Sequence, residues 1–165
     1  VKNWRIDDFT PAMEAGLKQT RNLENGRALF SATGCIACHS FRGEGGLAGP
    51  DLSSAGGRYT ARDLLDNIIN PGKVINEQNA LMIYTMKDGK QHIGRTVNMA
   101  GDVMMVATNP MDPGGSEIRF SNRELQSITQ SPVSFMPPGL VDTLTESDLL
   151  DLLAFLTQPV AELPR

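Results

Sequence analysis

Apolar residues spaced three and four apart predict a helix near each end of the chain. The earlier helix runs from about Leu23 to Ala32, with Asn22 as a candidate N-cap and Gly34 as a stop. The later helix follows Thr145 and runs to about Thr157. Its apolar stripe, with one aromatic residue beside it, consists of Leu149, Leu152, Leu153, Leu156 and Phe155.

Two short sequences have the form of a capping box, in which a threonine and an acidic residue three positions later satisfy the first amides of a helix. They are Thr60 with Asp63 and Thr145 with Asp148. The helix after Thr60 should end before Pro71, since the residue preceding a proline avoids helical angles. A short helix is also expected to open at Thr10-Pro11, after an irregular stretch over residues 1–9.

Between these helices the apolar period becomes alternating, which indicates strands. Asp88-Gly89 is a strong hairpin turn, and by that turn His92 should lie opposite Thr85. We predict a small antiparallel sheet inserted into a helical domain. The expected strands are Leu81 to Lys87, Gln91 to Val97, Val103 to Thr108, Glu117 to Phe120 and Leu125 to Thr129.

The predicted organisation is an N-terminal extension over 1–21, a domain over 22–158 with the sheet inserted at 80–130, and a tail over 159–165. A length of 165 residues suits one domain with a large insertion. A content of 40% hydrophobic residues argues against wholesale disorder. No stretch approaches the roughly 20 apolar residues that a membrane-spanning helix needs, so we expect no membrane span.

Composition changes this picture in two ways. The 19 acidic residues outnumber the 15 basic ones, for a net charge of -4, which argues against nucleic acid as the main partner. Aromatic residues make up only 5% of the chain, and glycine and proline contribute 16 and 10 residues. This aromatic content is low for a core made of protein side chains alone, and the many glycines and prolines predict that much of the chain is loop. We therefore expect a non-protein group to fill part of the interior.

The two cysteines stand in Cys35-Ile36-Ala37-Cys38-His39, which rules out a disulfide scaffold and leaves three kinds of site. A redox dithiol normally follows a strand, whereas a helix is predicted here. A zinc site needs four ligands, and only His92 could join, while Cys38 and His39 are awkward neighbours on one ion. Covalent haem attachment is the meaning of C-x-x-C-H. We interpret the motif as one haem c bound through Cys35 and Cys38, with His39 on the iron.

A haem would also explain the low aromatic content, because it is itself a large, flat, apolar body. Covalent attachment takes place outside the cytoplasm. The N-terminus lacks the basic-then-apolar pattern of a signal peptide, so we expect a periplasmic or otherwise extracytoplasmic protein whose signal peptide has been removed.

The second axial ligand is predicted to be Met136, one of eight methionines. Methionine in that position raises the reduction potential and is typical of electron transfer. Met136 lies in an irregular loop, Ser134 to Leu140, whose two prolines stiffen the backbone and orient the thioether. Other methionines fall in strand patterns and are expected to be packing residues, namely Met82, Met86, Met104 and Met105. His92 is the rival ligand, and a vacant site would permit oxygen or peroxide chemistry.

Taken in order, these motifs resemble the class I cytochrome c fold. They are a helix with Gly26-x-x-x-Phe30, the Cys35–His39 motif, Gly49-Pro50-Asp51-Leu52, Met136-Pro137 and a leucine-rich helix with Phe155. The resemblance implies that the first of these helices crosses the last, and that the carbonyl of Pro50 bonds the ligand histidine. It also implies that Arg58 and Tyr59 hold a haem propionate. The implied fold class is mainly α, a helical fold around one haem with a small antiparallel sheet inserted.

The chain is also similar to a haem-binding domain family known mainly from planctomycetes and often fused to dehydrogenases. The shared pattern comprises Gly57-Arg58-Tyr59, Ile68-Ile69-Asn70-Pro71, the block from Ile83 to Ile93 and the loop from Ser134 to Leu140. This likeness covers roughly Leu23 to Leu156.

The motifs and the resemblance together predict a monohaem c-type cytochrome, an electron carrier and not an enzyme. It would transfer single electrons between extracytoplasmic redox proteins, with low-spin iron held by His39 and Met136. The expected partners are a dehydrogenase donor and an oxidase or cytochrome acceptor. Two alternatives stay open: a peroxidase-like haem enzyme with an open sixth site, and a haem-bearing docking module of a larger dehydrogenase system.

Overall fold

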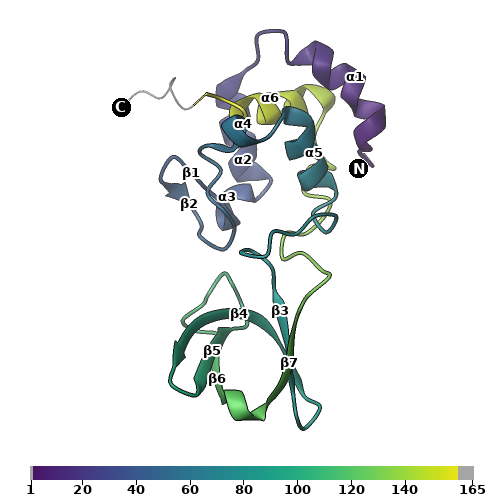
Figure 1. The fold of residues 1–165 in the computed structure, drawn as a ribbon. Coiled ribbons are helices and arrows are strands. Elements are labelled where there is room, and N and C mark those ends of the chain that lie inside the picture. Colours follow the sequence, from purple (N-terminus) through teal and green to yellow (C-terminus); the bar gives the residue numbers. More distant parts are fainter. Residues whose placement is uncertain (1, 160–165) are drawn as a thin grey trace. The chain divides into compact units, whose positions relative to one another are not determined.

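The chain forms two compact units, and residues 2–159 are described in this computed structural model (Figure 1). Of the described residues, 2–74 and 136–159 form a helical unit, while residues 75–135 form the other, which is a β-sheet. Among the described residues, helix accounts for 33% and strand for 22%. The expected fold class, mainly α with a small inserted sheet, is therefore wrong, because the sheet has a buried core of its own and is a separate unit.

The helical unit holds six helices and one short hairpin among its described residues. They are α1 (Ile6–Gly16), α2 (Leu23–Ala32), α3 (Cys35–Cys38), β1 (Ser40–Phe41), β2 (Glu44–Gly45), α4 (Ala55–Arg58), α5 (Ala61–Ile69) and α6 (Glu146–Leu156). Within residues 2–159, none of the helices has the length and apolar character needed to cross a membrane.

The helix starts that depend on capping were predicted correctly. Asn22 accepts a hydrogen bond from the Asn25 amide and so begins α2. Thr60 and Asp63 form a reciprocal capping box at the start of α5, and Thr145 with Asp148 does the same for α6. These caps satisfy amides that have no partner within their own helix.

The first helix was predicted wrongly. α1 begins at Ile6, so residues 6–9 are helical and Pro11 lies inside the helix, not at its first position. The loss of one backbone hydrogen bond at Pro11 is offset by burial, because Phe9, Met13 and Gly16 lie on one helix face and are buried. Acidic residues in the first turn also suit the positive end of the helix dipole.

The centre of the helical unit is the crossing of α2 and α6. A Cβ at Gly26 would collide with the backbone carbonyl of Asp151 and lie 2.6 Å from the Phe155 Cβ, so only glycine allows this approach. Next to the crossing, the ring centroids of Phe30 and Phe155 are 5.9 Å apart, and those of Phe41 and Phe155 are 4.5 Å apart. This cluster holds the hairpin that follows the cysteine motif against both helices.

The second unit is a five-stranded antiparallel meander whose last strand returns to pair with its first, in the order β6-β5-β4-β3-β7. Its strands are β3 (Met82–Met86), β4 (Gln91–Ala100), β5 (Val103–Ala107), β6 (Glu117–Ser121) and β7 (Leu125–Gln130), with a 3-10 turn at Asn122–Glu124. The sheet is strongly curved, which is clearest along β4 in Figure 1. All five strands correspond to predicted ones.

The hairpin register differs from the prediction by one residue. His92 pairs with Tyr84, and Thr85 pairs with Gln91. The amide of Met86 donates to the carbonyl of Lys90, which makes the connection a three-residue loop that ends on Gly89 at φ 88°. A two-residue turn had been assumed, and the extra residue shifts the pairing.

The β unit buries Tyr84, Met104 and Val106 at its centre, and the Tyr84 hydroxyl lies 2.8 Å from the Thr96 hydroxyl. Met104 and Met86 are buried in the sheet, as expected of packing methionines. The two ends of the unit meet, because the amide of Ser131 donates to the carbonyl of Leu81 at 2.8 Å. The chain thus enters and leaves the unit at neighbouring points, which is the geometry that domain insertion requires.

Candidate functional site

Both cysteines lie on the single turn of α3. Gly34, in the left-handed region at φ 81°, reverses the chain between α2 and this turn. The amide of His39 donates to the carbonyl of Cys35 at 2.9 Å and ends the turn, after which His39 is extended. The sequence motif therefore becomes one rigid turn with a histidine at its exit.

The two thiols are in different environments. Cys35 is buried, with 7% of its surface exposed, and burial raises the pKa of its thiol. The Thr33 hydroxyl lies 3.3 Å from its sulfur. Cys38 is only half-buried. A redox dithiol normally follows a strand, whereas α3 follows the helix α2 through Gly34, so the local fold argues against a dithiol site.

The imidazole of His39 is oriented by the loop that follows it. Its Nδ1 lies 2.8 Å from the carbonyl oxygen of Pro50. A carbonyl oxygen can only accept, so Nδ1 must carry the proton. The other ring nitrogen, Nε2, then has a free lone pair and is the atom that can bind a metal.

Glycines let the loop pass close to the cysteine motif. A Cβ at Gly45 or Gly46 would collide with the carbonyl of His39 or of Ala37. The amide of Gly46 donates to the carbonyl of Ile36 at 2.8 Å, and that of Gly49 donates to the carbonyl of Cys38 at 2.7 Å. The loop is thus fixed to the motif by its backbone.

Gly49→Ala should disturb this arrangement, because the added Cβ would lie 2.6 Å from Cε1 of the His39 ring. We expect the free energy of unfolding of the helical unit to fall by about 1–3 kcal/mol. Chemical denaturation followed by the fluorescence of Trp4, the single tryptophan, measures this. Gly57→Ala is the matched control, since nothing lies within 4 Å of a Cβ at Gly57. Equal losses in both variants would contradict the expectation.

Met136 belongs to the helical unit, although it comes shortly after β7 in the sequence. It is partly buried and packs against the same core as Ile36 of α3 and Leu52 of the loop. The rival His92 lies on β4 of the other unit and stacks on Phe120, with ring centroids 5.8 Å apart and planes 14° apart.

Arg58 and Tyr59 make hydrogen bonds to residues at the start of α4. Arg58 ends α4, is exposed, and donates to the Ser54 hydroxyl at 2.9 Å. The amide of Tyr59 donates to the carbonyl of Ala55, and 45% of the Tyr59 surface is exposed. The guanidinium of Arg58 is near enough to Asp51 to contribute to the lowered pKa of that carboxyl, after hydrogen bonds from Ser53 and Ser40.

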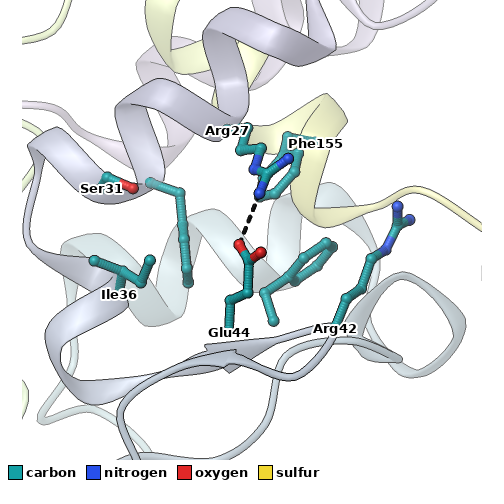
Figure 2. Close-up of a pocket in the computed structure, with 8 residues that line it drawn as sticks. Arg27, Ser31, Ile36, Arg42, Glu44 and Phe155 are labelled. Carbon is teal, nitrogen blue, oxygen red and sulfur yellow. Dashed lines mark hydrogen bonds and ion pairs between the residues drawn. The ribbon is translucent and has the colours of Figure 1, made fainter.

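A pocket of about 320 Å³ opens on the helical unit, among α2, α3, the hairpin and α6 (Figure 2). It is lined by Arg27, Phe30, Ser31, Ile36, Phe41, Arg42, Glu44 and Phe155. Arg27 and Glu44 form an exposed ion pair of 2.7 Å there. Among the described residues, neither of the cysteines lines this pocket, and His39 and Met136 do not line it either. The candidate ligands therefore do not converge on this pocket.

The hydrogen bonds of Asp51, in the loop after His39, were not predicted from the sequence. Asp51 bonds both Ser40 and Ser53, at 2.8 and 2.7 Å. A local signal existed for one of them, since Asp-x-Ser favours an Asx-turn. The bond to Ser40 joins residues 11 apart and has no local signal.

The sequence model of the family described as Cytochrome c matches residues 23–158. Among the curated proteins, none matches the chain. The matched stretch contains α3, His39, the glycine loop, Met136 and α6.

Proposed function

Because the chain belongs to the cytochrome c family, we propose that it carries single electrons on one haem whose iron is held by His39 and Met136. Proteins of this family bind haem c covalently and serve as electron carriers for redox proteins. The observation that carries the proposal is the bond from Nδ1 of His39 to the Pro50 carbonyl, which leaves Nε2 available to bind a metal.

The residues around the motif fit a haem c. Cys35 and Cys38 are spaced for two thioether bonds, and the glycines at 45, 46 and 49 leave out side chains where the loop meets the motif. Met136 offers a soft thioether from a proline-stiffened loop, a ligand type that raises the reduction potential. The network of Asp51 adds rigidity next to His39.

In this proposal the protein holds the haem in place and limits movement around it. When bound, the haem supplies an iron that gains and loses one electron. The Pro50 carbonyl keeps the proton on Nδ1 of His39, so the lone pair of Nε2 would be available to bind the iron. The rigid turn of α3 and the buried aromatic cluster of α2 and α6 limit movement during electron transfer. We assign Arg58 and Tyr59 to a haem propionate, a role supported by the exposed guanidinium at the end of α4.

The proposal extends to location and partners. Haem attachment supports an extracytoplasmic, periplasmic setting, and the likeness to the planctomycete haem-binding domains supports a dehydrogenase donor with an oxidase or cytochrome acceptor. The paired ends of the β unit support its description as an insertion within the cytochrome domain.

The test is an optical redox titration of the haem-loaded protein. We expect a single one-electron transition and a ferrous form that does not bind carbon monoxide at neutral pH, because both axial positions are filled. Rapid carbon monoxide binding together with turnover of peroxide would overturn the carrier assignment in favour of a peroxidase-like enzyme.

A further inference from the structure

We propose that Asp51 is a positioning residue for the haem ligand His39, acting through the peptide bond that it shares with Pro50. This inference rests on the proposed function, because it concerns how His39 is held as a ligand. Its evidence is a set of hydrogen bonds that joins the segment after His39 to the segment after Gly49.

The backbones of these two segments are bonded to each other. The amide of Leu52 donates to the carbonyl of Ser40 at 2.9 Å. The amide of Arg42 donates to the Ser53 hydroxyl at 2.7 Å. Residues 40–42 and 51–53 therefore lie side by side, and each restrains the other.

The carboxylate of Asp51 closes this arrangement with both of its oxygens. Oδ2 accepts from the Ser40 hydroxyl at 2.8 Å, and Oδ1 accepts from the Ser53 amide at 2.7 Å. Ser40 is buried, with 7% of its surface exposed, so its hydroxyl needs a partner within the protein. Hydrogen bonds from Ser53, and then from Ser40, lower the pKa of Asp51.

The carbonyl that accepts from His39 belongs to the peptide unit between Pro50 and Asp51. A peptide unit is planar, so its carbonyl direction is set by the residues on both sides. The proline ring fixes φ of Pro50, so the rotations that can still turn this plane are ψ of Pro50 and φ of Asp51. On the other side the Asp51 backbone is held by its own side-chain bonds to Ser40 and Ser53. Loss of those bonds frees the plane to turn away from Nδ1.

A local stabilising role for Asp51 makes a different prediction. The bond from the Ser53 amide alone is an Asx-turn, which would stabilise the loop without affecting the imidazole. The bond to Ser40 reaches the residue next to His39 and couples the turn to the ligand. Measurements on the histidine itself therefore distinguish the two roles.

The direction of the effect follows from ligand basicity. A hydrogen bond from Nδ1–H to a carbonyl makes Nε2 a stronger base, which favours the ferric state. Weakening that bond should raise the reduction potential. It should also expose Nδ1–H to water and speed the exchange of its proton with solvent.

The experiment compares Asp51→Ala, Asp51→Asn and Asp63→Ala in the haem-loaded protein. Both Asp51 variants remove the charge, but asparagine can still accept from the Ser53 amide and donate to the Ser40 hydroxyl. We expect Asp51→Ala to change the ferric-to-ferrous ratio about threefold, which is roughly +28 mV for one electron. Proton exchange at Nδ1 should become at least about tenfold faster. Asp51→Asn should change both far less.

Asp63→Ala is the matched control for charge and stability. Asp63 is also an exposed carboxylate of the helical unit whose partner is a hydroxyl, that of Thr60 in the α5 capping box. Its removal should leave the potential and the Nδ1 exchange unchanged. Equal shifts in Asp51→Ala and Asp51→Asn, or none in either, would overturn the positioning role. A parent protein whose iron is not bound by His39 would instead overturn the proposed function.

Discussion

Met136→Ala should open the sixth coordination position of the haem-loaded protein. We expect the variant to lose the methionine-to-iron absorption band of the ferric form and to bind carbon monoxide readily when reduced. Its reduction potential should fall, because a thioether ligand stabilises the ferrous state. Optical spectra with and without carbon monoxide, followed by a redox titration, measure all three changes.

Two variants serve as controls for this prediction. His92→Ala removes the rival ligand, which stacks on Phe120 in the β unit, and should leave the spectrum unchanged. Met99→Ala removes another thioether that is 52% exposed, and should also have no spectral effect. If Met136→Ala keeps the band while His92→Ala loses an axial ligand, the assignment of the sixth ligand is wrong.

The elements that could be predicted from the sequence are those fixed by local chemistry. Thr60 and Thr145 begin helices because each has its capping partner three residues later. α1 could not be predicted in this way, since burial of Phe9 and Met13 against distant residues outweighs the cost of an internal proline. The hairpin register was predicted wrongly because the loop has one additional residue, so His92 pairs with Tyr84 and not with Thr85.

The same distinction applies to the candidate site. Cys35, Cys38 and His39 are recognisable because their spacing alone carries the chemistry. The bonds of Asp51 to Ser40 and of Asp151 to Arg21 are not recognisable, since each joins residues that are far apart in the chain. The fold class was predicted wrongly because alternating strands do not indicate whether a sheet buries a core of its own.

Asp151→Ala is expected to have the largest effect on stability among the surface and core positions considered. Asp151 lies on α6 with its side chain 6% exposed, and its Oδ1 accepts from Nε of Arg21 at 2.8 Å and from the amide of Asn22 at 3.1 Å. The side chain of Arg21 is itself only 14% exposed. Alanine would leave this cation without its carboxylate and the Asn22 amide at the start of α2 without its acceptor, at a cost of about 3 kcal/mol or more.

A comparison with an exposed ion pair tests whether burial causes the large loss of stability expected for Asp151→Ala. Arg27 and Glu44 are 2.7 Å apart, but their side chains are 64% and 65% exposed. Glu44→Ala should therefore cost less than about 1 kcal/mol. Denaturation followed by Trp4 fluorescence measures both variants in the helical unit. Equal losses would mean that the Asp151 pair contributes no more than an ordinary surface contact.

The stabilising effect of Asp151 should also depend on pH in a defined direction. Burial acts to raise its pKa, but hydrogen bonds from Asn25 and Asn22 and the charge of Arg21 together hold the pKa below its ordinary value. A carboxyl whose pKa is lower in the folded state stabilises the protein above its unfolded pKa, about 3.9, and this contribution is lost as the pH falls further. The gap in unfolding free energy between the parent and Asp151→Asn should therefore be constant near neutrality and shrink below about pH 4. The other carboxyls titrate in both proteins and cancel in the difference, so a gap that stays constant down to pH 3 would show that the charge of Asp151 is not what holds α2 to α6.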